Sequence, residues 1–277
     1  MIFHSLRQAR SRESIQQRVR NYLKFIFLSK SQEGNNTYEG IYSNFKDARM
    51  NQENLTGYVS ERWLDIEVLK LEKMINEFKR NPEVAGNYRD RDLLLVIAGM
   101  NVKDIKILDI GSGFANTFFF LKTNYKRKID YVSVELTEIV LFLNQRLHEY
   151  DNFKACSLNA MPSEKFDLIY FGSSLQYLED YEDKLIEICK FKAPMIFISD
   201  TPMGNLNTFA TVQVNMEDRR IPRWVFSKMD VINLLSRYGY TLVAESIVDW
   251  HQQIHNFENF PTNYHQIRNR NLLFECK

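Results

Sequence analysis

From residue 105 to the end of the chain, short apolar runs alternate with stretches of helical length. This alternation predicts parallel strands that are connected by crossover helices. The expected strands cover residues 105–110, 131–135, 153–157, 166–171, 195–199, 241–248 and 271–276. The helix before the last two strands is well delimited, because Ser227 and Asp230 suit an amino-terminal capping box and Gly239 suits a carboxyl-terminal cap. We therefore expect an α/β domain over residues 104–277.

The part of the chain before this domain has a helical pattern. Apolar residues recur at helical spacing after residue 59, which predicts a helix with one buried face. They are Leu64, Val68, Leu71, Ile75 and Phe78. Asn81-Pro82 ends this helix, and a second helical stretch covers residues 89–100. We expect residues 39–103 to form a helical extension that serves as a lid or as one wall of a pocket.

The first thirty residues are strongly basic, with Glu13 as their one acidic residue, and end in the apolar run 22–28. This pattern predicts a basic amphipathic helix, followed by a polar linker up to residue 38. Such a helix can lie on an anionic membrane surface or dock its apolar side on its own domain, and the pattern leaves both open.

Composition and charge limit the class of protein and the partners to be expected. Apolar residues make up 44% and charged residues 26% of the chain, as in ordinary globular proteins. With 36 basic and 35 acidic residues the net charge is +1, so we expect no nucleic-acid partner. The three cysteines lie far apart and are expected to be reduced. No apolar run is long enough to span a bilayer and no leader pattern is visible, so we expect a cytoplasmic protein, at the inner face of the membrane if the basic segment binds lipid.

The segment from Ile105 to Asn116 combines a buried strand with a sharp turn into a helix. Gly111 and Gly113 allow unusual backbone angles and a close approach of a ligand to the main chain. In an open parallel sheet, ligands bind beyond the carboxyl ends of the strands, where this loop lies. A bulky residue in place of Gly111 is therefore expected to block the ligand while the protein still folds.

The residues around this loop favour one ligand. A dinucleotide site has a third glycine where this chain has Asn116, and the carboxylate of Asp109 repels phosphates but suits an ammonium and a sulfonium group. Glu135, at the end of the second strand, suits a two-pronged hydrogen bond with a ribose diol. These features predict binding of S-adenosylmethionine.

Several segments resemble class I S-adenosylmethionine-dependent methyltransferases, and more narrowly the methyltransferases of bacterial surface-polysaccharide gene clusters. The resemblance rests on the loop 109–113, on Glu135 and on segment 166–178, and it extends from about residue 40 to the end through the segments 40–42, 57–58, 200–202, 211–213, 222–227 and 238–240. It implies a Rossmann-like, doubly wound, seven-stranded sheet, mostly parallel with the last strand antiparallel. It also implies S-adenosylmethionine as cofactor and the O-methylation of a sugar hydroxyl. The cofactor-binding residues implied are Asp109, Gly111, Ser112, Gly113, Glu135, Leu136, Ser157, Leu158 and Ser173.

The acceptor of the methyl group is expected at the same edge of the sheet. Asp200, just after the fifth strand, is the first candidate for a general base, with a plain turn residue as the alternative. A long loop inserted at about 203–226 is expected to bind the substrate. The candidate substrate residues are Tyr42, Tyr58, Gln176, Tyr177, Gln213, Arg223 and Trp224. His251 is a second catalytic candidate, and no metal site is expected, because the histidine spacing does not match a ligand set.

Other functions remain open at this point. The acceptor is a small molecule or a glycan, and a non-sugar oxygen or nitrogen is an alternative to the sugar hydroxyl. A catalytically silent scaffold in polysaccharide assembly would not bind the donor, and a nicotinamide-dependent dehydrogenase would bind a dinucleotide instead. The chain is a monomer or a homo-oligomer.

Overall fold

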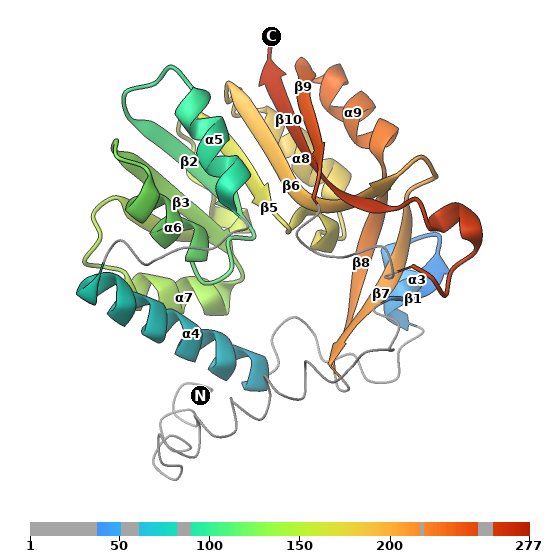
Figure 1. The fold of residues 1–277 in the computed structure, drawn as a ribbon, viewed down its shortest axis with the longest axis horizontal. Coiled ribbons are helices and arrows are strands. Elements are labelled where there is room, and N and C mark those ends of the chain that lie inside the picture. Colours follow the sequence, from blue (N-terminus) through green and yellow to red (C-terminus); the bar gives the residue numbers. More distant parts are fainter. Residues whose placement is uncertain (1–37, 51–60, 82–89, 217–218, 249–256) are drawn as a thin grey trace. The chain divides into compact units, whose positions relative to one another are not determined.

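Seven strands of the central sheet lie in the order β4-β3-β2-β5-β6-β10-β9 (Figure 1). The bounds of these strands are β2 (Ile105–Ile110), β3 (Ile129–Glu135), β4 (Phe153–Ser157), β5 (Leu168–Gly172), β6 (Met195–Gly204), β9 (Tyr240–Ile247) and β10 (Arg268–Cys276). β2 to β6 pair in parallel, whereas β10 is antiparallel to both β6 and β9. This confirms the predicted α/β sheet, mostly parallel and with the last strand antiparallel, but the seven predicted strands are part of a sheet of ten among the described residues.

The structure is a computed structural model that describes residues 38–50, 61–81, 90–216, 219–248 and 257–277. The described residues belong to one unit of the chain, which begins at Thr37. The basic amino-terminal segment, Tyr58 and His251 lie outside the described residues. Within the described chain, no helix has the length and the apolar character needed to cross a bilayer.

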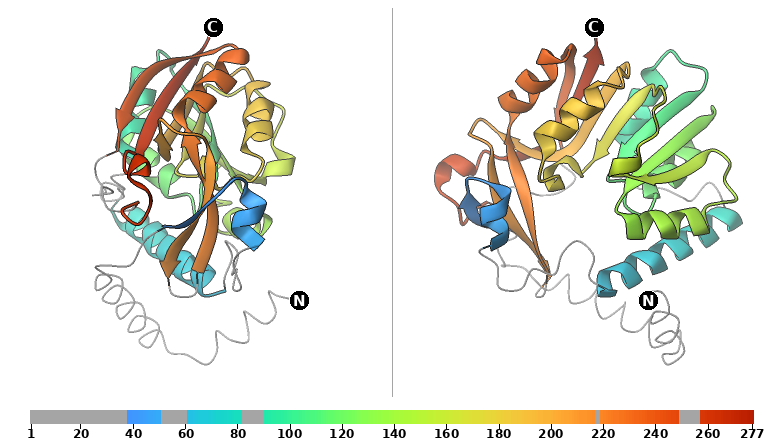
Figure 2. Two further views of the ribbon diagram at one scale, coloured as in Figure 1. Left: turned by 90° about the vertical axis from the view of Figure 1, so that its right-hand side faces the viewer. Right: turned by 180° about the vertical axis from the view of Figure 1, so that it is seen from behind.

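Helices cover both faces of the sheet (Figures 1 and 2). Residues of α4 (Glu61–Arg80), α5 (Arg91–Gly99), α6 (Asn116–Asn124) and α7 (Thr137–Arg146) share one apolar core, and residues of α8 (Tyr181–Cys189) and α9 (Lys228–Arg237) share the other. β2 contributes to both cores, with Ile105 and Ile107 on one face and Leu108 and Ile110 on the other. A strand that is buried on both faces reads as a continuous apolar run, which is why β2 was recognisable in the sequence.

A second group of strands extends the sheet beside β6. β7 (Phe209–Met216) and β8 (Arg219–Ser227) form an antiparallel pair, and β1 (Tyr38–Tyr42) pairs with β7. α3 (Phe45–Met50) packs beside them (Figure 1). The prediction of a loop at 203–226 was therefore wrong. The segment 39–103, predicted as a helical extension, contains α3, α4 and α5 but begins with β1. In β7 the polar residues Thr211 and Gln213 lie at alternate positions, as on a strand, whereas β8 begins with two consecutive arginines, a pattern that does not indicate a strand.

The predicted caps of α9 are present in a modified form. Ser227 Oγ accepts a hydrogen bond from the main-chain N–H of Asp230 at 3.2 Å. The return contact runs through a third residue, because Thr208 Oγ1 accepts from the N–H of Ser227 at 2.9 Å and donates to Asp230 Oδ2 at 2.9 Å. The helix is thus tied to the segment that joins β6 to β7.

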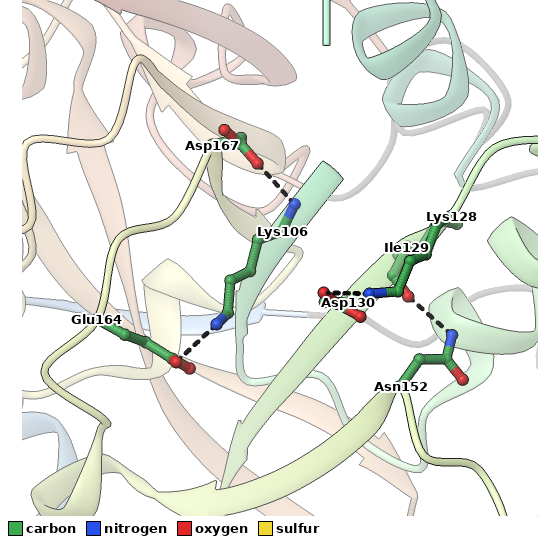
Figure 3. Close-up of polar contacts among 7 residues, drawn as sticks. All are labelled: Lys106, Lys128, Ile129, Asp130, Asn152, Glu164 and Asp167. Carbon is green, nitrogen blue, oxygen red and sulfur yellow. Dashed lines mark hydrogen bonds and ion pairs between the residues drawn. The ribbon is translucent and has the colours of Figure 1, made fainter. Parts of the chain in front are cut away.

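Polar contacts fix the strand register at the amino-terminal edge of the sheet (Figure 3). Asp167 accepts a hydrogen bond from the N–H of Lys106 at 2.7 Å, and the ammonium group of Lys106 lies 2.6 Å from the carboxylate of Glu164. The side chain of Asn152 donates to the carbonyl of Ile129 at 2.7 Å. With the register fixed here, the carboxyl ends of β2, β3, β4 and β5 meet at the opposite edge, where the candidate site lies.

Candidate functional site

The loop between β2 and α6 contains two glycines that have different roles. Both have left-handed backbone angles, with φ of 73° at Gly111 and 59° at Gly113. A β-carbon added at Gly111 would lie 2.4 Å from Cβ of Ser174, whereas one added at Gly113 would meet nothing within 4 Å. Gly111 therefore allows the close packing of β2 against the segment after β5, and Gly113 leaves the main chain open.

This difference corrects one expectation. A bulky residue at Gly111 would collide with Ser174, whose hydroxyl donates a hydrogen bond to the carbonyl of Ile110. The substitution would thus disturb the packing of the strands themselves. Gly113 is the position at which a side chain tests ligand binding without a collision inside the protein.

Glu135, at the carboxyl end of β3, is held by the same loop. Its Oε1 accepts a hydrogen bond from the N–H of Gly113 at 2.8 Å, and its Oε2 accepts from the N–H of Leu136 at 2.8 Å. Burial raises the pKa of Glu135, and the two backbone hydrogen bonds oppose that rise. Each carboxylate oxygen can accept more than one hydrogen bond, so the pre-oriented carboxylate offers two neighbouring acceptors to a diol.

Apolar and polar groups adjoin Glu135 on both sides. Leu136 is 43% exposed although it follows a buried strand. Ser157 is the partner of Glu135 in the register of β3 and β4, and Leu158 follows it. Four of the predicted cofactor-binding residues thus lie together at the ends of these two strands.

Asp109 is buried at the end of β2. Tyr131 donates a hydrogen bond to its Oδ2, whereas Oδ1 has no hydrogen-bond partner among the described residues. Burial raises the pKa of Asp109 well above its usual range; the Tyr131 hydrogen bond opposes this, and the charges of Asp90 and Glu135 add to it. An unpaired carboxylate oxygen in such surroundings attracts a cation and repels a phosphate.

Serine residues link the ends of the neighbouring strands through side-chain and main-chain hydrogen bonds. The hydroxyls of Ser112 and Ser133 are hydrogen-bonded to each other, which joins the loop to β3. The N–H of Ser173 donates to the carbonyl of Ser199 at 2.9 Å, which joins the end of β5 to β6. Ser173 has a positive φ of 58°. Left-handed residues other than glycine are uncommon and often mark functional sites.

Asp200 lies next to this junction, inside β6, and has a φ of 51°. It is buried, and its Oδ1 accepts a hydrogen bond from the side chain of Asn269 at 2.6 Å. Asp200 is thus not a simple turn residue, because β6 continues beyond it to Gly204. The role of Asp200 as a general base stays a prediction.

A cluster of hydrogen-bonded side chains adjoins Asp200. Arg223 donates to the hydroxyl of Tyr38 at 2.9 Å and to Oε1 of Gln213 at 3.1 Å, and the hydroxyl of Tyr177 donates to the same Oε1 at 2.7 Å. The guanidinium carbon of Arg223 lies 5.0 Å from the ring centre of Tyr38 and 5.4 Å from that of Tyr177, which allows cation–π attraction to both rings. Burial raises the pKa of Tyr38; Arg223 opposes this, and Tyr177 and Asp200 add to it. We call Tyr38, Tyr177, Gln213 and Arg223 the tyrosine–arginine cluster.

Gln176 supports this region from within. It is fully buried, its Nε2 donates to the hydroxyl of Ser173 at 3.2 Å, and its Oε1 accepts from the hydroxyl of Thr201 at 3.4 Å. Gln176 therefore ties the end of β5 to β6, and its role in binding the substrate stays a prediction.

Two predicted substrate residues are placed elsewhere. Trp224 is 9% exposed, its ring packs on Phe45 and Tyr181, and its N–H donates to the carbonyls of Leu178 and Glu179. The prediction that Trp224 stacks on a sugar was wrong, because alternate residues of β8 face opposite sides and Trp224 faces the core. Tyr42 packs partly buried against that same core and covers Gly40.

The sequence reading missed Tyr38, Asn269 and Asn271. The two asparagines lie two positions apart in β10, a spacing that places both on one face of a strand. The available signal was weak, because β10 also contains Arg268, Arg270 and Glu275, so polar residues in it do not stand out. In the described part of the chain, no group of histidine, cysteine and acidic residues is arranged to hold a metal ion.

The residues at the carboxyl ends of β2 and β3 fit S-adenosylmethionine. Gly113 offers open main chain, Glu135 offers two acceptors for a ribose diol, and the unpaired oxygen of Asp109 suits the ammonium group. The strand order and the place of these residues agree with the Rossmann-like, mostly parallel sheet expected from the resemblance in sequence.

Solved structures similar to this chain include several methyltransferases. The 1,6-didemethyltoxoflavin-N1-methyltransferase of Burkholderia thailandensis, solved with 1,6-didemethyltoxoflavin and S-adenosylhomocysteine, is 14% identical over 79% of this chain and 91% of its own, with a TM-score of 0.49. The CcbJ methyltransferase of Streptomyces caelestis is 13% identical over 73% and 95%, with a TM-score of 0.47. A S-adenosylmethionine-dependent methyltransferase of Clostridium acetobutylicum is 12% identical over 74% and 98%, with a TM-score of 0.47.

No protein-family model and no curated protein sequence matches the chain. At 12–14% identity, the likeness to these three structures does not bear on the reaction or the acceptor.

Proposed function

We propose that the chain is a S-adenosylmethionine-dependent methyltransferase that methylates a sugar hydroxyl of a bacterial surface polysaccharide or of its precursor. The donor supplies a methyl group that positive sulfur has already activated, so the protein has to align the nucleophile and exclude water. The observation that supports this most is the combination, at one edge of the sheet, of an open main chain at Gly113, the oriented carboxylate of Glu135 and the unpaired oxygen of Asp109.

Each of these residues has a distinct task. The carboxylate of Glu135 would accept hydrogen bonds from the two ribose hydroxyls, and the N–H groups of Gly113 and Leu136 keep it in place. Asp109, whose pKa is raised by burial, would ionise beside the ammonium group and hold it through its unpaired oxygen. The exposed side chain of Leu136 offers an apolar surface to the adenine.

The acceptor half of the proposal rests on Asp200 and the tyrosine–arginine cluster. A hydroxyl nucleophile must lose its proton, and a positioned carboxylate contributes about 10²- to 10⁴-fold as a general base. Phenol and guanidinium groups suit an acceptor that carries several hydroxyls. The choice of a sugar comes from the resemblance in sequence. A nucleic acid is not proposed, because the net charge of +1 gives no field that would attract it.

Two measurements test the two halves. Calorimetric titration with S-adenosylhomocysteine tests the donor site, and an absence of binding by the folded protein would favour the silent scaffold. Methyl transfer from S-adenosylmethionine to a panel of methyl glycosides and of non-sugar alcohols and amines tests the acceptor. Activity confined to the non-sugar compounds would refute the sugar assignment and keep the methyltransferase.

A further inference from the structure

A bulge shapes β6 at Asp200. In the antiparallel pair of β6 and β10, Arg270 lies opposite Thr201 and Leu272 lies opposite Ile198. Asn271 alone therefore faces two residues, Ser199 and Asp200. Asp200 is the one with the left-handed φ of 51°. Such bulges redirect a side chain and are common next to active sites.

Asn271 uses its whole amide group to hold this bulge. Its Oδ1 accepts from the hydroxyl of Ser199 at 2.8 Å and from the N–H of Asp200 at 3.0 Å. Its Nδ2 donates to Asp92 Oδ2 at 2.5 Å and to Ser246 Oγ at 3.1 Å. Two donated and two accepted hydrogen bonds satisfy an asparagine side chain completely, so its orientation is fixed. Asn271 is buried, which makes each of these bonds costly to lose.

Asn269 acts on the carboxylate itself. It lies two positions away on the same face of β10 and is also buried. Its Nδ2 donates to Asp200 Oδ1 at 2.6 Å and reaches the carbonyl of Asp200 at 3.4 Å. One carboxylate oxygen is thereby bound to the protein, and the other is left to accept a proton from a hydroxyl.

We propose that Asn269 and Asn271 are positioning residues, which hold the backbone and the carboxylate of Asp200 in the orientation required of the general base. This rests on the proposed function. Asn271 fixes the left-handed backbone, and Asn269 selects which oxygen of the carboxylate faces the acceptor. The alternative is a bulge with a structural role only, which lets β6 pair first with β10 and then with β8. Such a bulge would need the contact of Asn271 with the main chain, but not the contact of Asn269 with the carboxylate of Asp200.

A double-mutant cycle separates these two roles. Methyl transfer to the methyl glycosides is measured for Asn269→Ala, for Asp200→Asn and for the double variant, together with S-adenosylhomocysteine affinity and urea unfolding. We expect turnover to fall about 10- to 100-fold in Asn269→Ala and about 10²- to 10⁴-fold in Asp200→Asn, with donor affinity unchanged. The double variant should be no slower than Asp200→Asn, because Asn269 acts through Asp200.

Asn152→Ala is the matched control. It removes an amide that donates to the carbonyl of Ile129 at the opposite edge of the sheet, so it should lower stability and leave turnover unchanged (Figure 3). Asn269→Ser is a second variant with a smaller change of volume. Turnover effects that multiply in the double variant would overturn the positioning role while methyl transfer stands. Failure of the wild-type protein to bind S-adenosylhomocysteine would refute the proposed function itself.

Discussion

Replacing Gly113 by alanine adds one methyl group at the point where the main chain of the loop is open. The added β-carbon meets no atom of the protein within 4 Å, so a loss of donor binding would mean that the methyl group occupies space that the ligand needs. Gly239 offers a matched control, because it has a φ of 88° and also has nothing within 4 Å of an added β-carbon. It lies at the end of α9, away from the candidate site.

The two alanine variants should be equally destabilised. A left-handed backbone costs a residue with a side chain about 1–2 kcal/mol, and the lower entropy of the unfolded alanine chain offsets about 0.4–1 kcal/mol of this. We therefore expect each variant to lose about 1 kcal/mol of the free energy of unfolding. Gly111→Ala should lose more, about 2–5 kcal/mol, because its β-carbon also lies 2.4 Å from that of Ser174.

Urea unfolding measures the stability of each variant, and calorimetry measures its affinity for S-adenosylhomocysteine. We expect Gly113→Ala to bind at least about tenfold more weakly than wild type, a loss of roughly 1.4 kcal/mol, and Gly239→Ala to bind like wild type. Equal affinities of the two variants would show that the donor does not touch the main chain at Gly113, and the reasoning about this loop would fail.

Three further substitutions test other parts of the site. Burial raises the pKa of Asp109, and a neighbouring ammonium group favours its ionised form, so binding of S-adenosylhomocysteine should release a proton and should become tighter as pH rises toward that pKa. Calorimetry in buffers of different ionisation enthalpy measures this release. It should be lost in Asp109→Asn and absent with 5′-methylthioadenosine, which has no ammonium group. Equal proton release with both ligands would exclude Asp109 as the group that responds. Glu135→Gln should weaken binding of S-adenosylhomocysteine by about 1.5–3 kcal/mol, and unchanged affinity in calorimetry would place the ribose elsewhere. Trp224→Phe should lower the free energy of unfolding by about 1–3 kcal/mol, because two backbone carbonyls lose their donor, with KM for the acceptor unchanged; a raised KM at unchanged stability would return Trp224 to the acceptor site.

The parallel core of the fold could be predicted because its strands are short and largely apolar. β2 and β4 have the predicted bounds: β2 is buried on both faces and mostly apolar, whereas β4 is an edge strand in which Phe153 is buried and the other residues are not. β7 and β8 were missed, because polar side chains such as Gln213 and Arg223 interrupt any continuous apolar run and favoured a loop. Their character as strands depends on pairing with each other and with β1 and β6.

The residues of the proposed donor site could be named from the sequence because they lie close together along the chain. Gly111, Gly113 and Asp109 are neighbours in sequence, and Glu135 follows at the end of the next strand. The acceptor side depends on contacts between distant segments. Asn269 meets Asp200 across 69 positions, and Tyr38 meets Arg223 across 185, so only the folded sheet brings these groups together.

A crystal structure of the complex with S-adenosylhomocysteine tests the central claim most directly. We predict that both ribose hydroxyls lie within hydrogen-bond distance of the carboxylate of Glu135, that the ligand covers the main chain at Gly113 and that its amino group faces Asp109. A ligand bound at another place on the folded protein, with this edge of the sheet unchanged, would contradict the assignment.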